Sequence, residues 1–249
     1  FKQKTAYEIP KRDWSSDVCS SDLTGPMLLA SQVSYTDMTP LAHLLNEYVG
    51  FAVRPDSPIK SARDLIERLR KDPASVSFGV STALAGSNHL ATVLALKKAG
   101  VDIKRLRIIV VAGAADGITG VMGGHIDVVA SSAAGMMSHL QSGKLRGIAV
   151  SGPQRLSGPF TEVPTWKEQG VDSVYANWRG VVGPKGLSSA QIAYWDGVLA
   201  QLANLSEWKQ GLTRLMQDPV YLNSQETRRY LDAQHQELRG VLVELGLAK

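Results

Sequence analysis

Short apolar runs alternate with amphipathic stretches along the chain from Tyr48 onward. The runs are rich in Val and Ile, are bounded by Gly, Pro or Ser, and are mostly apolar on both faces, which is typical of buried parallel strands. They predict strands at Val49–Val53, Val76–Val80, Leu106–Val111, Ile126–Ala130, Leu145–Val150 and Tyr175–Val182. The stretches between them predict helices at Ser61–Arg70, Asn88–Ala99, Gly117–Met122 and Met136–Gln141. This alternation predicts an α/β fold with right-handed crossovers and a parallel-rich sheet flanked by helices.

The pattern changes after Gly183, where amphipathic helices dominate. It predicts helices at Ser188–Leu205, Ser206–Met216 and Glu226–Leu245, and a weak strand at Val220–Leu222. These helices would cover a second sheet formed partly by residues before Tyr48. We therefore expect two lobes, with residues 24–54 and 183–249 forming domain 1 and residues 55–182 forming domain 2. A cleft between two lobes is where ligands usually bind.

The first 23 residues follow neither pattern. Their polar and charged residues are scattered without a helical or strand period. The blocks Phe1–Ile9 and Trp14–Leu23 resemble a peptide produced when sequencing-adapter DNA is translated. We expect residues 1–23 to be a non-native, disordered segment, and we expect the native protein to continue further before Thr24.

Composition excludes several classes of protein. Hydrophobic residues make up 44% of the chain and no apolar run approaches the roughly 20 residues that span a bilayer. The net charge of +4 favours anionic ligands, but no Lys/Arg block with interleaved aromatic residues predicts nucleic-acid binding. Cys19 is the only cysteine, so a disulfide within the chain and a cysteine-based metal cluster are excluded.

Three predicted strand-to-helix corners consist mainly of small residues: Gly79–Asn88, Ala112–Asp116 and Ser131–Gly135. In a parallel sheet all three lie at the carboxyl ends of the strands, where open α/β folds bind ligands. Helix N-terminal amides attract anions, and the side chains of Ser81, Thr82, Ser87 and Asn88 can add donors. We expect an anion held by backbone N–H and hydroxyl groups, at roughly 1.5–3 kcal/mol per charge-assisted bond. The alternative is a helix capped by Ser87 or Asn88 without any ligand.

Catalytic and metal-binding patterns are weak. Gly79–Ala83 resembles the G-x-S-x-G nucleophile elbow with Ala at its last position, so the alternative function is an α/β hydrolase that uses Ser81. Such an enzyme needs a His and an acid near Ser81. The five histidines show no metal-ligand spacing. His89 is typical of a helix-surface or capping histidine, and direct contact with the ligand is the alternative. Trp178 and Arg179 form a packing pair, or Arg179 faces the anion. A regulatory ligand sensor would need a DNA-binding helix pair, and the sequence contains none. We expect no enzyme activity, cofactor or metal.

Seven motifs together resemble the substrate-binding proteins of tripartite tricarboxylate transporters, also called Bug receptors. They are Arg54–Lys60, Ala85–His89, Gly123–Val128, Ser142–Arg146, Val163–Gly170, Asn177–Gly180 and Pro184–Leu187. The resemblance runs from Thr24 to Lys249. It implies a two-lobed, type II periplasmic-binding-protein-like fold and a periplasmic, monomeric receptor. Such a receptor binds a dicarboxylate, or a tricarboxylate such as citrate, and delivers it to integral-membrane transporter subunits.

The resemblance also implies a set of ligand-binding residues. They are Ser81, Thr82, Gly86, Ser87, Asn88, Gly113, Ala114, Ser131 and Ser132. Val111-Ala112-Gly113 stands where many members carry Tyr-Lys-Gly, so that side-chain contact is lost here. The Ser131-Ser132 pair and Trp166–Gly170 resemble the tricarboxylate-type branch more closely. The family's first strand and Gly-rich first loop have no counterpart, so we expect this chain to bind its ligand poorly.

Overall fold

The computed structural model describes residues 18–19, 24, 27, 34–81 and 83–248. The chain divides into two compact units, each with its own packed core. Unit 1 contains residues 1–46, 178–240 and 248–249, and unit 2 contains residues 47–177 and 241–247. The chain passes between them within strands β2 (Met38–Val53) and β7 (Ala176–Pro184).

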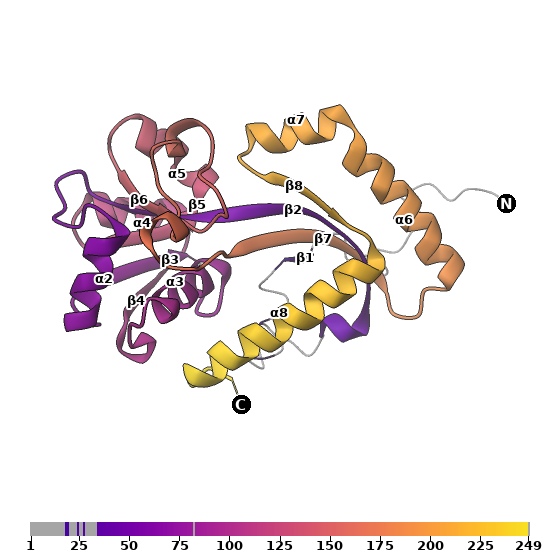
Figure 1. Ribbon diagram of the computed structural model, residues 1–249, viewed down its shortest axis with the longest axis horizontal. Helices are drawn as coiled ribbons and strands as arrows, with labels where there is room; N and C mark the ends of the chain where they lie inside the picture. Colours follow the sequence, from indigo (N-terminus) through magenta and orange to yellow (C-terminus); the bar gives the residue numbers. More distant parts are fainter. Residues whose placement is uncertain (1–17, 20–23, 25–26, 28–33, 82, 249) are drawn as a thin grey trace. The chain divides into compact units, whose positions relative to one another are not determined.

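Unit 2 contains a five-stranded sheet in the order β6–β2–β5–β3–β4 (Figure 1). Its further strands are β3 (Ser77–Ser81), β4 (Arg107–Val111), β5 (Val128–Ser132) and β6 (Arg146–Val150). The parallel prediction is confirmed for β3 with β4 and for β3 with β5. It is wrong for β2, which runs antiparallel to β5 and β6. The sheet is therefore mixed, because β2 enters it from unit 1 instead of from a crossover helix.

The helices of unit 2 occupy the predicted positions. They are α2 (Ala62–Lys71), α3 (Ser87–Lys98), α4 (Ala114–Met122) and α5 (Ala133–Gln141), with 3-10 turns η2 (Ile103–Arg105), η3 (Gly158–Phe160) and η4 (Lys167–Gln169). Both α4 and α5 begin three residues before the predicted starts at Gly117 and Met136. Their first turns are rich in Ala, which has the highest helix propensity but gives no amphipathic signal.

Strand β2 is sixteen residues long, although the apolar pattern predicts only Val49–Val53. Polar residues interrupt its first part and hide the strand period. The structure accommodates one of them, because His43 is buried and its Nε2 lies 2.8 Å from Asn46 Oδ1. The same part of β2 pairs antiparallel with β8 (Asp218–Leu222) in unit 1, which confirms the weak strand signal near Val220.

Unit 1 packs helices against the sheet that β1, β7, β2 and β8 form. Its helices are η1 (Tyr35–Asp37), α6 (Ser189–Asn204), α7 (Ser206–Arg214) and α8 (Ser224–Glu244), of which α8 continues into unit 2. Ser188 and Gln191 cap α6 reciprocally, as predicted. A Cβ on Gly180 would lie 2.4 Å from the carbonyl oxygen of Ala42, so β7 approaches β2 closely there. Trp178 is buried and packs against His43 and Tyr230, whereas its pairing with Arg179 and the role of Arg179 stay predictions.

Most of the segment expected to be non-native lies outside the described residues. Its two described residues, Val18–Cys19, form strand β1 and pair with Arg179 and Gly180. Within the described part of the chain, no helix is both long and apolar enough to cross a bilayer.

Candidate functional site

The three corners lie at one edge of the sheet of unit 2. β3 lies between β4 and β5, and all three strands run in the same direction. Ser81, the last residue of β3, is in register with Val111, the last residue of β4. Val80 is in register with Ala130, two residues before the end of β5. The strand ends therefore place the openings of α3, α4 and α5 at a common edge.

The first corner connects Ser81 to α3, and His89 shapes it. Ala85 is buried and adopts the left-handed backbone conformation, with φ at 61°. Its N–H donates over 2.9 Å to Nδ1 of His89, which lies in the first turn of the helix. Burial lowers the pKa of His89 to about 4, so the ring is neutral near pH 7 and its Nδ1 can accept. His89 is thus buried and not on the surface, and it holds the Ala85 amide before the helix instead of capping α3.

The first turn of α3 carries amides that have no acceptor within the helix. Helical hydrogen bonding begins with the Leu90 N–H, which donates to the Gly86 carbonyl. The amides of Ser87, Asn88 and His89 therefore have no acceptor within the helix. No side chain caps this end of the helix. The capping alternative for Ser87 and Asn88 is therefore wrong: the Ser87 hydroxyl donates to Asn177, and the Asn88 amide donates to Ser81 Oγ over 2.5 Å.

The second and third corners lie against each other. A Cβ on Gly135 would lie 3.2 Å from Ser132 Oγ and 4.0 Å from both Ser131 Oγ and Ala114 Cβ. Gly113 begins α4 without a side-chain cap, and the helical bonds begin with Gly117 N–H to the Gly113 carbonyl. Ser132 caps α5 by accepting from Gly135 N–H over 3.2 Å. The first turn of α4 therefore presents amides without a side-chain cap, as α3 does. In α5 the Gly135 amide is already engaged by Ser132.

Three residues with a role at these corners are absent from the predicted set. Asn177 Oδ1 accepts from the Ser87 hydroxyl over 2.8 Å, and Asn177 Nδ2 donates to Glu47 Oε2 over 2.9 Å. Because a carboxylate only accepts, the Glu47 contact fixes the orientation of the Asn177 amide and makes Ser87 the donor. Asp116 adds a negative charge to the first turn of α4. The motif at Asn177–Gly180 was the available signal for Asn177, while Glu47 gave none.

The hydrolase alternative needs a His and an acid close to the Ser81 hydroxyl. The Ser81 hydroxyl accepts from Asn88, and the nearby His89 uses its Nδ1 for the Ala85 amide. Thr82 lies outside the described residues, so its predicted role stays a prediction.

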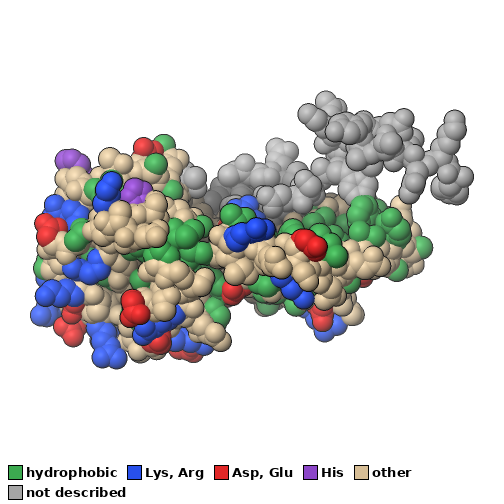
Figure 2. Space-filling model, turned by 90° about the horizontal axis from the view of Figure 1, so that it is seen from above, with side chains coloured by type: hydrophobic (Ala, Val, Ile, Leu, Met, Phe, Trp, Pro, Cys, Tyr) green, Lys and Arg blue, Asp and Glu red, His purple; other side chains and the backbone are tan. Residues whose placement is uncertain are grey.

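Charge on the face drawn in Figure 2, and metal-ligand chemistry among the described residues, add no competing site. On the face in Figure 2, Lys and Arg side chains are interspersed with Asp and Glu instead of gathering in one patch. No group of three or more His, Cys, Asp or Glu side chains among the described residues is arranged to hold a metal ion.

Known proteins share this fold. The chain superposes on a TctC solute-binding protein from Polaromonas with a TM-score of 0.76 and 24% identity, over 92% of this chain and 77% of that one. An R. palustris protein solved with adipate gives a TM-score of 0.71 and 24% identity, over 87% and 71% of the two chains. MatC from Rhodopseudomonas palustris, solved with malate, gives a TM-score of 0.69 and 15% identity, over 91% of this chain and 77% of that one.

Sequence comparison agrees with the shared fold. A protein encoded in the gbd 5′ region of Cupriavidus necator is 26% identical over 213 residues, which span 86% of this chain and 63% of that relative. The family model described as "Tripartite tricarboxylate transporter family receptor" matches residues 20–247. The chain therefore belongs to the tripartite tricarboxylate transporter receptor (TctC) family.

Proposed function

We propose that this chain is a solute receptor that binds a small dicarboxylate at the helix openings of unit 2. The observation that carries the proposal is the common sheet edge of three corners, where α3 and α4 begin without side-chain caps. Amides at a helix N-terminus, together with the helix dipole, bind negatively charged groups. The proposed ligand-binding residues are the predicted ones: Ser81, Thr82, Gly86, Ser87, Asn88, Gly113, Ala114, Ser131 and Ser132.

A dicarboxylate is the first choice of ligand because structural neighbours were solved with adipate and with malate. Two separate uncapped openings suit a ligand with two anionic ends. A tricarboxylate such as citrate is the second choice, since it fits the family description. The charge-assisted bonds to amides would contribute roughly 1.5–3 kcal/mol each.

The receptor would act in the periplasm as a monomer and without a cofactor. It would deliver its ligand to the integral-membrane subunits of a tripartite tricarboxylate transporter, as the family description implies. This role requires reversible binding and no covalent chemistry.

Replacing Ala114 by Pro tests the proposal at a single amide. Ala114 is the first residue of α4, where Pro is tolerated because that N–H has no helical acceptor. Gly113 before it is extended (φ −159°, ψ 175°), close to the backbone conformation that a following Pro prefers. Calorimetric titration with adipate, malate and citrate should show binding weakened roughly 10- to 100-fold by Ala114→Pro, the loss expected for one charge-assisted bond.

The matched control is Ser189→Pro, which changes the corresponding first position of α6 in unit 1 and should leave affinity unchanged. Because this chain spans 63% of its relative's length, the titrations are repeated on a longer form of the protein that covers that length. Failure of both forms to bind any of the acids, or equal affinity of Ala114→Pro and the parent, would contradict the proposal.

A further inference from the structure

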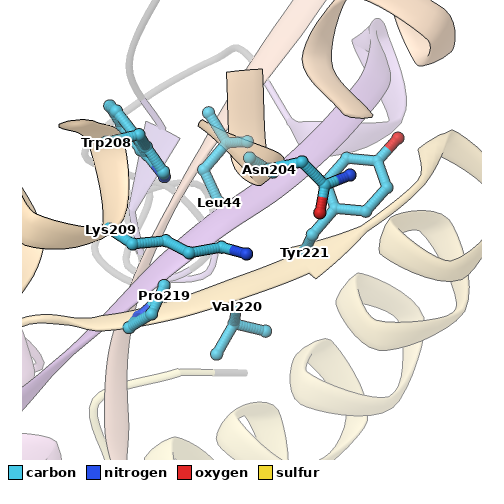
Figure 3. Close-up of a pocket in the computed structure, with 8 residues that line it drawn as sticks. Leu44, Asn204, Trp208, Lys209, Pro219, Val220 and Tyr221 are labelled. Carbon is cyan, nitrogen blue, oxygen red and sulfur yellow. The ribbon is translucent and has the colours of Figure 1, made fainter. Parts of the chain in front are cut away.

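Unit 1 contains a pocket that is separate from the corners of unit 2. It lies beside the end of α6, the first turn of α7 and strand β8, and it has a volume of about 170 Å³ (Figure 3). Leu44, Ala203 and Pro219 give it apolar walls. Leu44 also belongs to the buried core of unit 1, against which Trp208 and Tyr221 pack. The pocket is therefore an open continuation of a packed apolar core.

Two donors in this pocket have no acceptor among the described residues. The indole Nε1–H of Trp208 is buried and makes no hydrogen bond to any described residue. Lys209 makes no ion pair with a described residue. In Figure 3 the Lys209 side chain runs across the group of lining residues, with its ammonium end near their centre. A buried donor without a partner costs free energy, and a bound acceptor would remove that cost.

The other polar groups of the pocket are already engaged in part. The side-chain amide of Asn204 donates to the Ala200 carbonyl over 3.0 Å, and the Tyr221 hydroxyl donates to the Asp196 carbonyl over 3.1 Å. The groups without an acceptor among the described residues are thus the exposed ammonium of Lys209 and the buried N–H of Trp208, both of which donate. A ligand that matches them carries an acceptor with negative charge at one end and an apolar body at the other.

From this geometry we propose that the pocket is a second binding site, for a small monocarboxylate with an apolar body. The carboxylate accepts from Lys209 Nζ and Trp208 Nε1, and the body packs against Leu44, Ala203 and Pro219. The volume limits the ligand, because an engineered apolar cavity of about 150 Å³ holds benzene. Benzoate and isovalerate are therefore suitable probes, whereas a long-chain fatty acid is too large.

Tryptophan fluorescence and calorimetry of the full chain test the site. Benzoate and isovalerate should bind with a change in emission, and the uncharged analogue benzyl alcohol should bind at least tenfold more weakly. Lys209→Met keeps the aliphatic stem and removes the charge, so it should weaken benzoate binding roughly 10- to 100-fold. Lys209→Arg should restore most of the affinity. Trp208→Phe keeps an aromatic ring but should lose the emission change, which assigns the signal to this pocket.

Two controls separate this site from the proposed function. Lys104→Met removes an exposed lysine from unit 2, and Ala114→Pro changes the α4 opening. Both should leave benzoate binding unchanged. No binding of either acid, equal binding of benzyl alcohol, or unaltered affinity in Lys209→Met would each overturn the proposal. Loss of benzoate binding in Ala114→Pro would also overturn it, by showing that the acid binds at the unit 2 corners.

Discussion

The backbone N–H of Ala85 donates to Nδ1 of His89 over 2.9 Å, and this bond joins the first candidate corner to the helix that follows it. Ala85 is held in the left-handed region, where a side chain with a Cβ is strained. Only an unprotonated Nδ1 can accept that hydrogen, so the conformation of the corner depends on a neutral His89.

Stability should therefore fall as the solution becomes more acidic. Burial lowers the pKa of His89 from 6.5 to about 4, so the unfolded chain takes up a proton at a higher pH than the folded chain does. The free energy of unfolding should be unaffected by His89 above pH 6.5 and should decline as the pH falls towards 4, by up to about 3 kcal/mol. Urea unfolding at a series of pH values measures this.

His89→Gln is the control for that titration, because it removes the ionisable ring. Its pH dependence should be shallower than that of the parent between pH 6.5 and 4. Burial also lowers the pKa of His43, so part of the slope should persist in the variant. Identical slopes for the two proteins would show that His89 does not titrate as the structure implies.

The contacts from Ser87 to Asn177 and from Asn177 to Glu47 should act as one network. Replacing Asn177 by Leu keeps the approximate volume and removes both hydrogen bonds. We expect carboxylate binding to weaken roughly tenfold, because the first turn of α3 loses the contact that orients Ser87. A double-mutant cycle with Ser87→Ala should be non-additive, and additive losses of affinity would exclude the coupling.

Asp116 should oppose anion binding at the α4 opening. Its carboxylate lies in the first turn of the helix, where it stabilises the helix dipole but repels a second negative charge. Asp116→Asn should tighten binding of a dicarboxylate several-fold and lower stability by about 0.5 kcal/mol. Glu207→Gln, in the first turn of α7, supplies the comparison and should not change affinity. Weaker binding in Asp116→Asn would mean that this carboxylate helps to hold the ligand.

Gly180 should tolerate no side chain. A Cβ there would lie 2.4 Å from the Ala42 carbonyl oxygen, so Gly180→Ala must push β7 away from β2, at a cost of about 1–3 kcal/mol. Gly197→Ala changes a glycine of α6 with open space around it and should stabilise the protein by roughly 0.5–1 kcal/mol. Thermal unfolding of the two variants compares a steric clash with simple helix propensity.

The sequence predicts the strands and helices of unit 2 well because their apolar periods are uninterrupted. It misses the first part of β2, because polar residues such as His43 and Asn46 interrupt the apolar pattern and the burial of His43 does not show in the sequence. It also places the starts of α4 and α5 too late, since Ala-rich turns have no amphipathic period. Antiparallel pairing of β2 with β5 depends on where a distant strand enters the sheet.

The candidate site is predictable in part, because the strands that lead to it have uninterrupted apolar periods. Small residues after buried strands indicate the three corners, and the parallel order of β5, β3 and β4 brings their ends to one edge. Asn177 contacts Ser87 although it lies 90 positions later in the chain, so only the folded structure reveals that contact. The role of His89 depends on burial, which its position in the sequence does not show.

Strand β2 contributes residues to both units: His43 pairs with Leu222 of β8, while Gly50 pairs with both Ser131 of β5 and Val150 of β6. Neither unit can lose this strand without breaking its own ladder of hydrogen bonds. Amide protons in the centre of β2 should therefore exchange with deuterium more slowly than those of the surface helices. Denaturation should proceed as a single cooperative event instead of two independent ones.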